Sequence, residues 1–73
     1  MSDEPGDLDR FAANLRAARA KRDLTLLEAG AACGVHYTVI ARLENGKREP
    51  RLTTITKLAR GLGVPAADLL RGL

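Results

Sequence analysis

The sequence predicts an all-α fold, a compact bundle of five short helices, and three observations lead to this prediction. Alanine and leucine dominate the composition, and both residues favour helix. Apolar residues recur at spacings of three and four along successive segments, which is the period of a helix that buries one side. Long alternation of β-branched residues is missing from the sequence. Residues 53–56 come nearest to it and lie inside a helical pattern.

The bulk composition limits the kind of domain. The 73 residues allow one domain with a small core. The hydrophobic content of 45% is higher than that of intrinsically disordered chains. Phe11 and Tyr37 are the two aromatic residues, so the core must be aliphatic. A single cysteine, Cys33, excludes an internal disulfide and a cysteine-based zinc site, and we expect it to be a small core residue. We expect residues 1–7 to form a disordered acidic tail and 8–73 the folded domain.

The charge is distributed unevenly along the chain. The formal net charge is +3, but residues 1–9 hold four acidic residues and no basic one. Residues 10–73 therefore hold twelve basic and five acidic residues, or +7. Such a domain attracts phosphate polymers, although basic side chains also serve solubility. No signal sequence and no apolar run of about 18 residues is visible, so we expect a cytoplasmic protein without membrane contact.

The first predicted helix follows the acidic tail. Asp7 is the expected N-cap, and Lys21-Arg22-Asp23 is the expected end. Basic residues crowd the last turns of this helix, where they suit the helix dipole. The apolar stripe consists of Leu8, Phe11, Leu15 and Ala18.

A capping box begins the second predicted helix. Thr25 and Glu28 have the spacing at which each side chain bonds the other residue's backbone amide. We expect this helix to span about 26–33, with Ala29 and Cys33 pointing inward. Gly30 in its middle costs about 1 kcal/mol relative to alanine, so we expect a crossing helix to approach closely there.

A glycine turn leads into the third predicted helix, about residues 36–44. Gly34 suits a left-handed position after the second helix, and Val35 is expected to fill the core between the two helices. Ile40 and Leu43 should face inward. Two short helices joined by a three- or four-residue turn containing glycine form a helix-turn-helix, which can present its second helix to the DNA major groove.

Two further helices are predicted after a basic loop. The first is marked by apolar residues from 52 to 62, and Gly61 and Gly63 should mark its fraying end. A short fifth helix should begin at Val64-Pro65, because proline fits the first helical position. Leu69 and Leu70 should supply its apolar side.

Several motifs match one known family. They are Leu15-Arg16 with Arg19, Leu24-Thr25, Glu28, Cys33-Gly34-Val35, Ile40, Arg42 to Arg48, Pro50, Leu58-Ala59 and Leu62-Gly63-Val64. On these residues the chain resembles the helix-turn-helix family of phage repressors and Cro proteins, including xenobiotic-response-element type regulators of bacteria. The resemblance covers 8–71. It implies a lambda-repressor-like fold and a bacterial or phage transcriptional regulator associated with the nucleoid. It also implies ion pairs of Arg16 and Arg19, with Glu44 as a candidate partner.

The chain departs from the family pattern at several positions. Leu26 stands where the family usually has a phosphate-binding glutamine, and Ala29-Gly30 replaces the usual Leu-Ala pair. His36 replaces the usual serine before the third helix. Arg51 replaces the usual Ser or Thr that caps the fourth.

The third helix supplies the expected base contacts. These residues are Tyr37, Thr38, Ala41 and Arg42. The planar fork of Arg42 can bond guanine O6 and N7 together, worth about 1–3 kcal/mol of discrimination. Its alternatives are a phosphate contact or an ion pair with Glu44 or Glu49. Thr38 could bond a base, touch a thymine methyl group or remain solvated.

The expected phosphate contacts flank that helix. They are Thr25, His36, Lys47, Arg48 and Arg51. His36 lies where a helix N-terminus favours phosphate, and it could serve either as an N-cap or, when protonated, as a phosphate ligand. The three basic residues after the helix suit the sugar-phosphate backbone, and such contacts add affinity but little sequence information.

The sequence thus predicts a sequence-specific DNA-binding regulator, such as a repressor or autoregulator, rather than an enzyme. No catalytic constellation, metal spacing, cofactor motif or small-molecule site is visible. The partner should be double-stranded DNA bound by a weak or DNA-induced homodimer. Val64, Leu69, Leu70 and Leu73 offer the expected pairing surface. Exposed Leu26 or Leu27 favours one alternative, a module that binds a protein partner (an antitoxin or coactivator-like protein). A nonspecific architectural DNA binder is the other.

Overall fold

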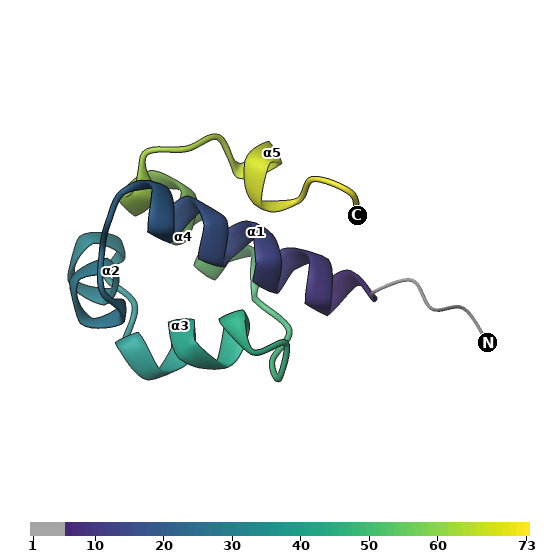
Figure 1. Cartoon of the computed structure of the whole chain (residues 1–73), viewed down its shortest axis with the longest axis horizontal. Coiled ribbons are helices and arrows are strands. Elements are labelled where there is room, and N and C mark those ends of the chain that lie inside the picture. Colours follow the sequence, from purple (N-terminus) through teal and green to yellow (C-terminus); the bar gives the residue numbers. More distant parts are fainter. Residues whose placement is uncertain (1–5) are drawn as a thin grey trace.

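Five helices account for most of residues 6–73, the part of the chain that the computed structural model describes. In Figure 1, α2 lies at one end of α1, α3 runs below α1, α4 lies behind it and α5 lies above. The helices are α1 (Asp7–Lys21), α2 (Leu26–Cys33), α3 (Tyr37–Glu44), α4 (Leu52–Leu62) and α5 (Ala66–Leu69). This confirms the predicted all-α class and the order of the elements.

Helix α1 begins one residue earlier than the predicted boundary. The N-cap is Gly6, whose carbonyl accepts from the Arg10 amide at 3.0 Å, so the prediction of Asp7 as N-cap was wrong. Asp7 lies instead in the first turn, where a carboxylate complements the positive end of the helix dipole. Most of the predicted tail, residues 1–5, lies outside the described residues. Of the predicted apolar stripe, Phe11 and Leu15 are buried, whereas Leu8 is exposed at the open end of the helix.

The predicted capping box forms at the start of α2. The Thr25 hydroxyl accepts from the Glu28 amide at 3.1 Å, and the Glu28 carboxylate accepts from the Thr25 amide at 2.9 Å. The hydrogen bond from the Thr25 backbone lowers the pKa of Glu28, and the Thr25 side chain lowers it further. The box therefore favours the ionised carboxylate.

Acidification should weaken this box. A carboxyl group whose pKa is lower in the folded state stabilises the fold above its unfolded pKa, and that contribution is lost as the pH falls through the folded value. We expect Glu28→Gln to lower the melting temperature at neutral pH, and the difference from wild type to shrink in acid. Thermal denaturation of both proteins across pH tests this. Glu49→Gln is the control, because Glu49 is exposed and makes no ion pair or hydrogen bond with another residue in 6–73. A difference that does not change with pH would contradict the prediction.

The turn between α2 and α3 brings their backbones close together. Gly34 adopts the predicted left-handed conformation with φ of 69°, and the amides of Gly34 and Val35 both donate to the Gly30 carbonyl at 2.9 and 3.1 Å. A Cβ at Gly30 would lie 2.7 Å from the Val35 carbonyl oxygen and 3.1 Å from the Tyr37 nitrogen. The close approach expected at Gly30 is thus confirmed, and it fixes where α3 begins.

A second close approach joins α2 to α4. A Cβ at Gly61 would lie 2.5 Å from the Cα and Sγ atoms of Cys33. Gly61 lies in the last turn of α4, near the end of the helix as predicted, but it packs at a tight helix crossing, so the expectation that this end is frayed was wrong. Gly63 does end the helix, in the left-handed conformation. Pro65 is the N-cap of α5 rather than its first helical residue.

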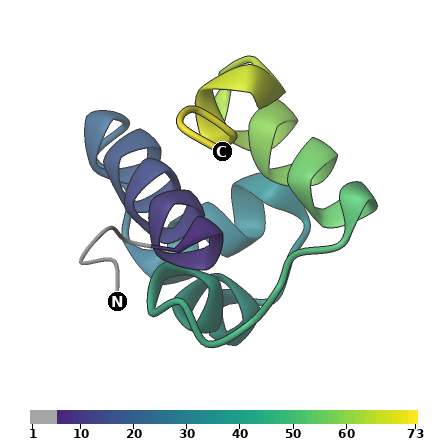
Figure 2. The same cartoon turned by 90° about the vertical axis from the view of Figure 1, so that its right-hand side faces the viewer.

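Apart from Phe11, the large buried side chains of the described residues are aliphatic, close to the prediction of an aliphatic core, and every helix contributes to the core. Its largest fully buried side chains are Phe11, Leu15, Ile40, Leu43, Leu58, Leu62 and Leu69. Helix α2 contributes the smaller Ala29 and Cys33, and burial raises the pKa of the Cys33 thiol. Leu69 is fully buried, so its predicted role in a pairing surface was wrong. In the end-on view of Figure 2, the C-terminal segment closes the bundle between α1 and α4, opposite α3. Within residues 6–73 no helix is long and apolar enough to span a membrane.

Candidate nucleic-acid interface

Helix α3 has one buried face and one exposed face. Ile40 and Leu43 are each 1% exposed and pack in the core, which confirms their predicted orientation. Tyr37, Thr38 and Arg42 are exposed, and Ala41 is half-buried. The four residues expected to contact bases therefore lie outside the core on one short helix, and the small Ala41 is the least exposed of them.

His36 caps the N-terminus of α3, which is one of the two roles expected for it. The His36 Nδ1 atom accepts from the Thr38 amide at 3.2 Å and lies 2.7 Å from the Thr38 hydroxyl oxygen. The imidazole also stacks on Tyr37, with ring centroids 4.8 Å apart and planes inclined by 25°. His36 begins no helix itself, so α3 starts one residue later than predicted. The contact between the side chains of His36 and Thr38 was not predicted from sequence, although a capping residue followed two positions later by a hydroxyl was a usable signal.

The C-terminal end of α3 is fixed by an ion pair with α1. Glu44 is 5% exposed and is the one buried charged residue among 6–73. The guanidinium of Arg19 binds both of its carboxylate oxygens, at 2.6 and 2.8 Å, and Arg16 donates to the Glu44 carbonyl at 2.7 Å. The hydrogen bond to Glu44 raises the pKa of Arg19, against the opposing effect of burial. The Arg16 Nε atom also lies 3.8 Å from the Glu44 Oε1 atom, so the ion pairs of Arg16 and Arg19 that the resemblance implied are confirmed, and they hold the end of α3 against α1.

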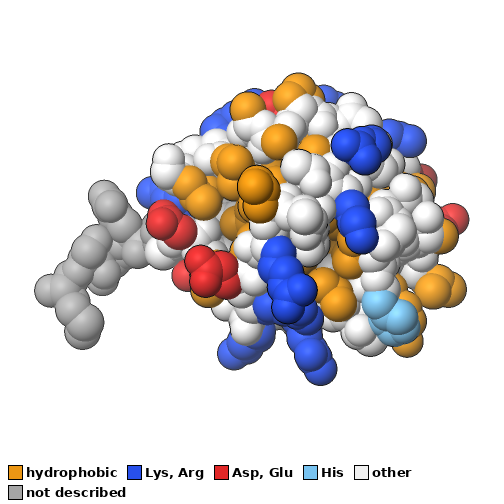
Figure 3. Space-filling model, turned by 180° about the vertical axis from the view of Figure 1, so that it is seen from behind, with side chains coloured by type: hydrophobic (Ala, Val, Ile, Leu, Met, Phe, Trp, Pro, Cys, Tyr) orange, Lys and Arg blue, Asp and Glu red, His pale blue; other side chains and the backbone are white. Residues whose placement is uncertain are grey.

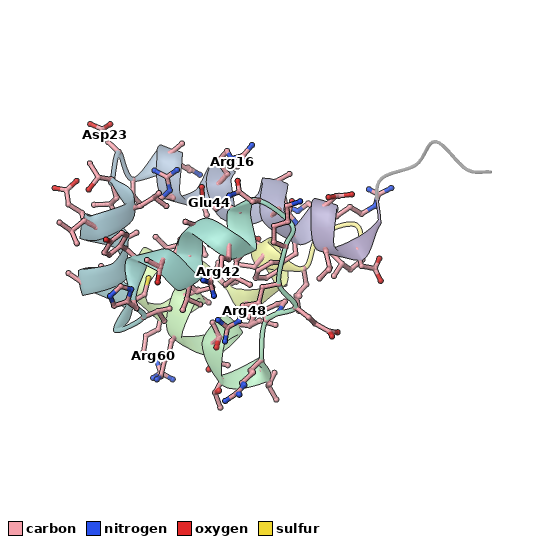
Figure 4. The ribbon with its side chains drawn as sticks, turned by 90° about the horizontal axis from the view of Figure 1, so that it is seen from below. Arg16, Asp23, Arg42, Glu44, Arg48 and Arg60 are labelled. Carbon is pink, nitrogen blue, oxygen red and sulfur yellow. The ribbon has the colours of Figure 1, made fainter. Side chains whose placement is uncertain are left out.

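Arg42 lies on the other side of α3 from this ion pair. Figure 4 shows Glu44 next to Arg16, whereas Arg42 and Arg48 lie on the side toward α4. Glu44 is occupied by Arg19, and within the described chain Arg42 makes no salt bridge with Glu44 or Glu49. The guanidinium of Arg42 is therefore available to an external ligand.

The loop after α3 extends the basic surface. Lys47, Arg48 and Arg51 are all exposed, and the Lys47 amide donates to the Arg42 carbonyl at 3.1 Å, which holds the start of the loop against α3. None of the three forms a salt bridge with another residue in 6–73. Arg51 occupies the N-cap of α4 without a side-chain hydrogen bond there. Figure 3 shows lysine and arginine side chains gathered along the lower surface, with the pale blue histidine at one side.

The first residues of α2 border this basic surface and are less polar than it. Thr25 is exposed, and its hydroxyl oxygen already accepts from Glu28. Leu26 is half-buried against the core, whereas Leu27 is 66% exposed. One of the two leucines is thus exposed, as the sequence required. Leu27 lines a shallow apolar hollow together with Gly30, Ala31, Gly34, Val35, His36 and Tyr37.

Comparison with known proteins agrees with this geometry. The helix-turn-helix family profile matches residues 15–69. The chain belongs to the helix-turn-helix family. It is 41% identical over 64 residues to the HTH-type transcriptional repressor RghR of Bacillus subtilis (strain 168), covering 86% of this chain and 47% of that protein. It is 37% identical over 60 residues to the cryptic phage CTXphi transcriptional repressor RstR of Vibrio cholerae, covering 82% of this chain and 54% of that protein. The resemblance to phage repressors is confirmed.

Solved helix-turn-helix structures superpose well on the chain. The restriction-modification controller protein C.AhdI from Aeromonas hydrophila has a TM-score of 0.83 at 28% identity, covering 86% of this chain and 96% of that one. The clp gene regulator ClgR from Corynebacterium glutamicum has a TM-score of 0.84 at 31% identity, covering 92% and 71%. The chain spans about half the length of the two curated repressors, so it corresponds to one part of those proteins. These relatives are regulators, which agrees with the expectation that the chain is not an enzyme.

Proposed function

We propose that this chain is the DNA-reading domain of a sequence-specific transcriptional regulator, of the repressor or autoregulator type, and that α3 enters the major groove. The observation that carries the proposal is the position of Arg42: an exposed guanidinium on a core-anchored helix, without a salt-bridge partner in 6–73 and next to an exposed basic loop. Membership of the helix-turn-helix family supports it, and the comparisons give the protein-partner and architectural alternatives no support. The site of action would be nucleoid DNA in the cytoplasm of a bacterium, or of a phage-infected one.

The contacts divide by chemistry. Tyr37, Thr38, Ala41 and Arg42 face the base edges, where Arg42 can bond a guanine in bidentate fashion. Thr25, His36, Lys47, Arg48 and Arg51 contact the phosphates that border the groove. His36 can do so without becoming a cation, because its Nδ1 atom accepts within the protein and leaves an Nε2–H donor for a phosphate oxygen.

A weak or DNA-induced homodimer would bind two half-sites about 34 Å apart. Apolar surface for such pairing lies away from α3, where Leu8, Leu70 and Leu73 are exposed around a shallow hollow that also includes Pro50 and Ile55. Figure 3 shows this hydrophobic area above the basic surface, with acidic side chains at its edge. Pairing there would leave both copies of α3 uncovered.

The test begins with selection of bound sequences from a random duplex pool, followed by titration of the selected duplex at several salt concentrations. With three Lys or Arg contacts to phosphate per protomer, from Lys47, Arg48 and Arg51, log affinity should fall with log salt at a slope of about −3 for one protomer and about −5 for a dimer. Arg42→Ala should weaken binding by about 1–3 kcal/mol and relax the preference at one base pair. Lys47→Ala should weaken all sequences alike and reduce the slope by about 1.

Arg60→Ala is the matched control for these variants. Arg60 is exposed on α4 and lies away from α3 in Figure 4, so its loss should leave base preference unchanged. A pool without an enriched sequence, together with affinity that does not respond to salt, would contradict the proposed function.

A further inference from the structure

The backbone contact between Thr38 and His36 indicates which ring nitrogen carries the proton, and this tautomer in turn assigns the direction of the contact between the two side chains. The Thr38 backbone N–H points at the His36 Nδ1 atom from 3.2 Å, and an N–H group can only donate. The Nδ1 atom must therefore carry a lone pair, with the ring proton on Nε2. A proton on Nδ1 would place two donors against each other at the N-terminus of α3.

The Thr38 hydroxyl faces the same Nδ1 atom from 2.7 Å, the length of a good hydrogen bond. Because Nδ1 is an acceptor, the hydroxyl must be the donor in this contact. A threonine hydroxyl has one hydrogen and two lone pairs. With its hydrogen directed at His36, Thr38 presents only acceptor lone pairs to a ligand that approaches its exposed side.

The imidazole is held in this orientation by more than one contact. The Nδ1 atom contacts both the backbone amide and the hydroxyl group of Thr38, and the ring stacks on Tyr37 with ring centroids 4.8 Å apart. Within the described chain the Nε2 atom has no hydrogen-bond partner, so its N–H points to solvent or to a ligand. His36 thus supplies a helix cap and an outward donor, and it directs the neighbouring hydroxyl.

We propose that His36 acts as a positioning residue that makes Thr38 an obligate hydrogen-bond acceptor, so that Thr38 selects a base with an amino group in the major groove. In that groove adenine N6 and cytosine N4 donate, whereas guanine O6 and thymine O4 accept. Thr38 therefore favours adenine over guanine when it faces a purine, and cytosine over thymine when it faces a pyrimidine. The inference rests on the proposed function of α3 and specifies what one of its residues reads.

The hydrogen positions can be measured without DNA. In alkaline buffer, ¹⁵N NMR of the imidazole should show an unprotonated Nδ1 and a protonated Nε2. Thr38→Val, which removes the hydroxyl and keeps the shape, should shift the Nδ1 resonance because Nδ1 loses one donor. A protonated Nδ1, or an Nδ1 resonance that does not respond to Thr38→Val, would overturn the proposal.

The base preference is measured by selection from a random duplex pool with four proteins. The wild type should enrich an amino-bearing base at one position, and Thr38→Val should lose that preference, a change on the order of 2- to 12-fold in relative affinity. His36→Ser keeps an N-cap, but its hydroxyl can donate as well as accept, so the preference should relax. His36→Asn restores a pure acceptor through its Oδ1 atom, so the preference should return.

An altered duplex gives the sharpest control. Replacing the selected adenine by 2′-deoxynebularine, or the selected cytosine by the 2-pyrimidinone nucleoside, removes only the amino group. This should weaken wild-type binding by the same factor as Thr38→Val and should leave Thr38→Val binding unchanged. A pool without enriched sequences would refute the proposed function and the inference together. An enriched sequence that keeps its preference in both Thr38→Val and His36→Ser, or that carries guanine or thymine at the position, would refute the inference alone.

Discussion

Replacing Arg19 by methionine should destabilise the folded domain by about 3 kcal/mol, because the Glu44 carboxylate would stay buried without the guanidinium that binds both of its oxygens. We expect a value at the lower end of the range for buried pairs, since the Arg19 side chain remains 20% exposed. For a domain of this size the melting temperature should fall by about 12 °C or more. Urea denaturation monitored by circular dichroism gives the free energy of unfolding directly.

Two controls separate the loss of the main partner of a buried charge from the loss of a surface ion pair. Arg71→Met removes the partner of Asp68 from an exposed pair, and such pairs contribute about 0–1 kcal/mol. The double variant Arg19→Met/Glu44→Leu removes both charges, so it should recover part of the stability that the single variant loses. If Arg19→Met cost no more than Arg71→Met, the ion pair would not be an anchor of α3.

Truncating Leu43 to alanine should cost about 2–5 kcal/mol, the range for a buried leucine that leaves a cavity. A domain of 73 residues has a total stability of about 4–11 kcal/mol, so this one change removes a large share of it. The side chain lies on the buried face of α3, and its loss should also reduce DNA affinity under conditions in which the variant is still folded. Denaturation and duplex titration of the same variant measure the two effects.

Leu52→Ala is the matched control for this truncation. It is the same chemical change at a side chain that is 77% exposed, and we expect an effect within about 0.5 kcal/mol. Equal costs at the two positions would mean that Leu43 does not pack as the structure shows.

The parts of the fold that depend on local interactions could be predicted from sequence. The capping box of Thr25 and Glu28 sets the start of α2, and Gly34 sets its end, so both limits were predicted correctly. The inward positions of Ile40 and Leu43 follow from the helical period. In each case residues within a few positions of one another carry the information.

The parts that depend on distant segments could not be predicted in the same way. The position of Gly61 near the end of a helix could be predicted from sequence, but only the closeness of Cys33 on α2 explains why a residue without a side chain is needed there. Leu69 looks like a surface leucine of a short helix, but it is covered once α5 packs against α4 and α1. Helix crossings of this kind leave no local pattern.

The candidate interface shows the same division. The exposed position of Arg42 was predictable from the period of α3, whereas the absence of a bond to Glu44 depends on Arg19 of another helix. The contact between Thr38 and His36 depends on the rotation of one imidazole ring, which sequence spacing does not determine. The roles of these residues toward DNA stay predictions until binding is measured.

Both ends of α3 are anchored by contacts that do not involve the side chains that we assign to base reading. Arg19 and Arg16 hold the last turn through Glu44, and the turn at Gly30 fixes the first. The exposed positions 37 and 42, and the half-buried position 41, can therefore be exchanged with little effect on these anchoring contacts. The domain is thus a natural scaffold for reprogramming: libraries randomised at these three positions could yield variants directed to new operators, while the anchoring contacts are left intact.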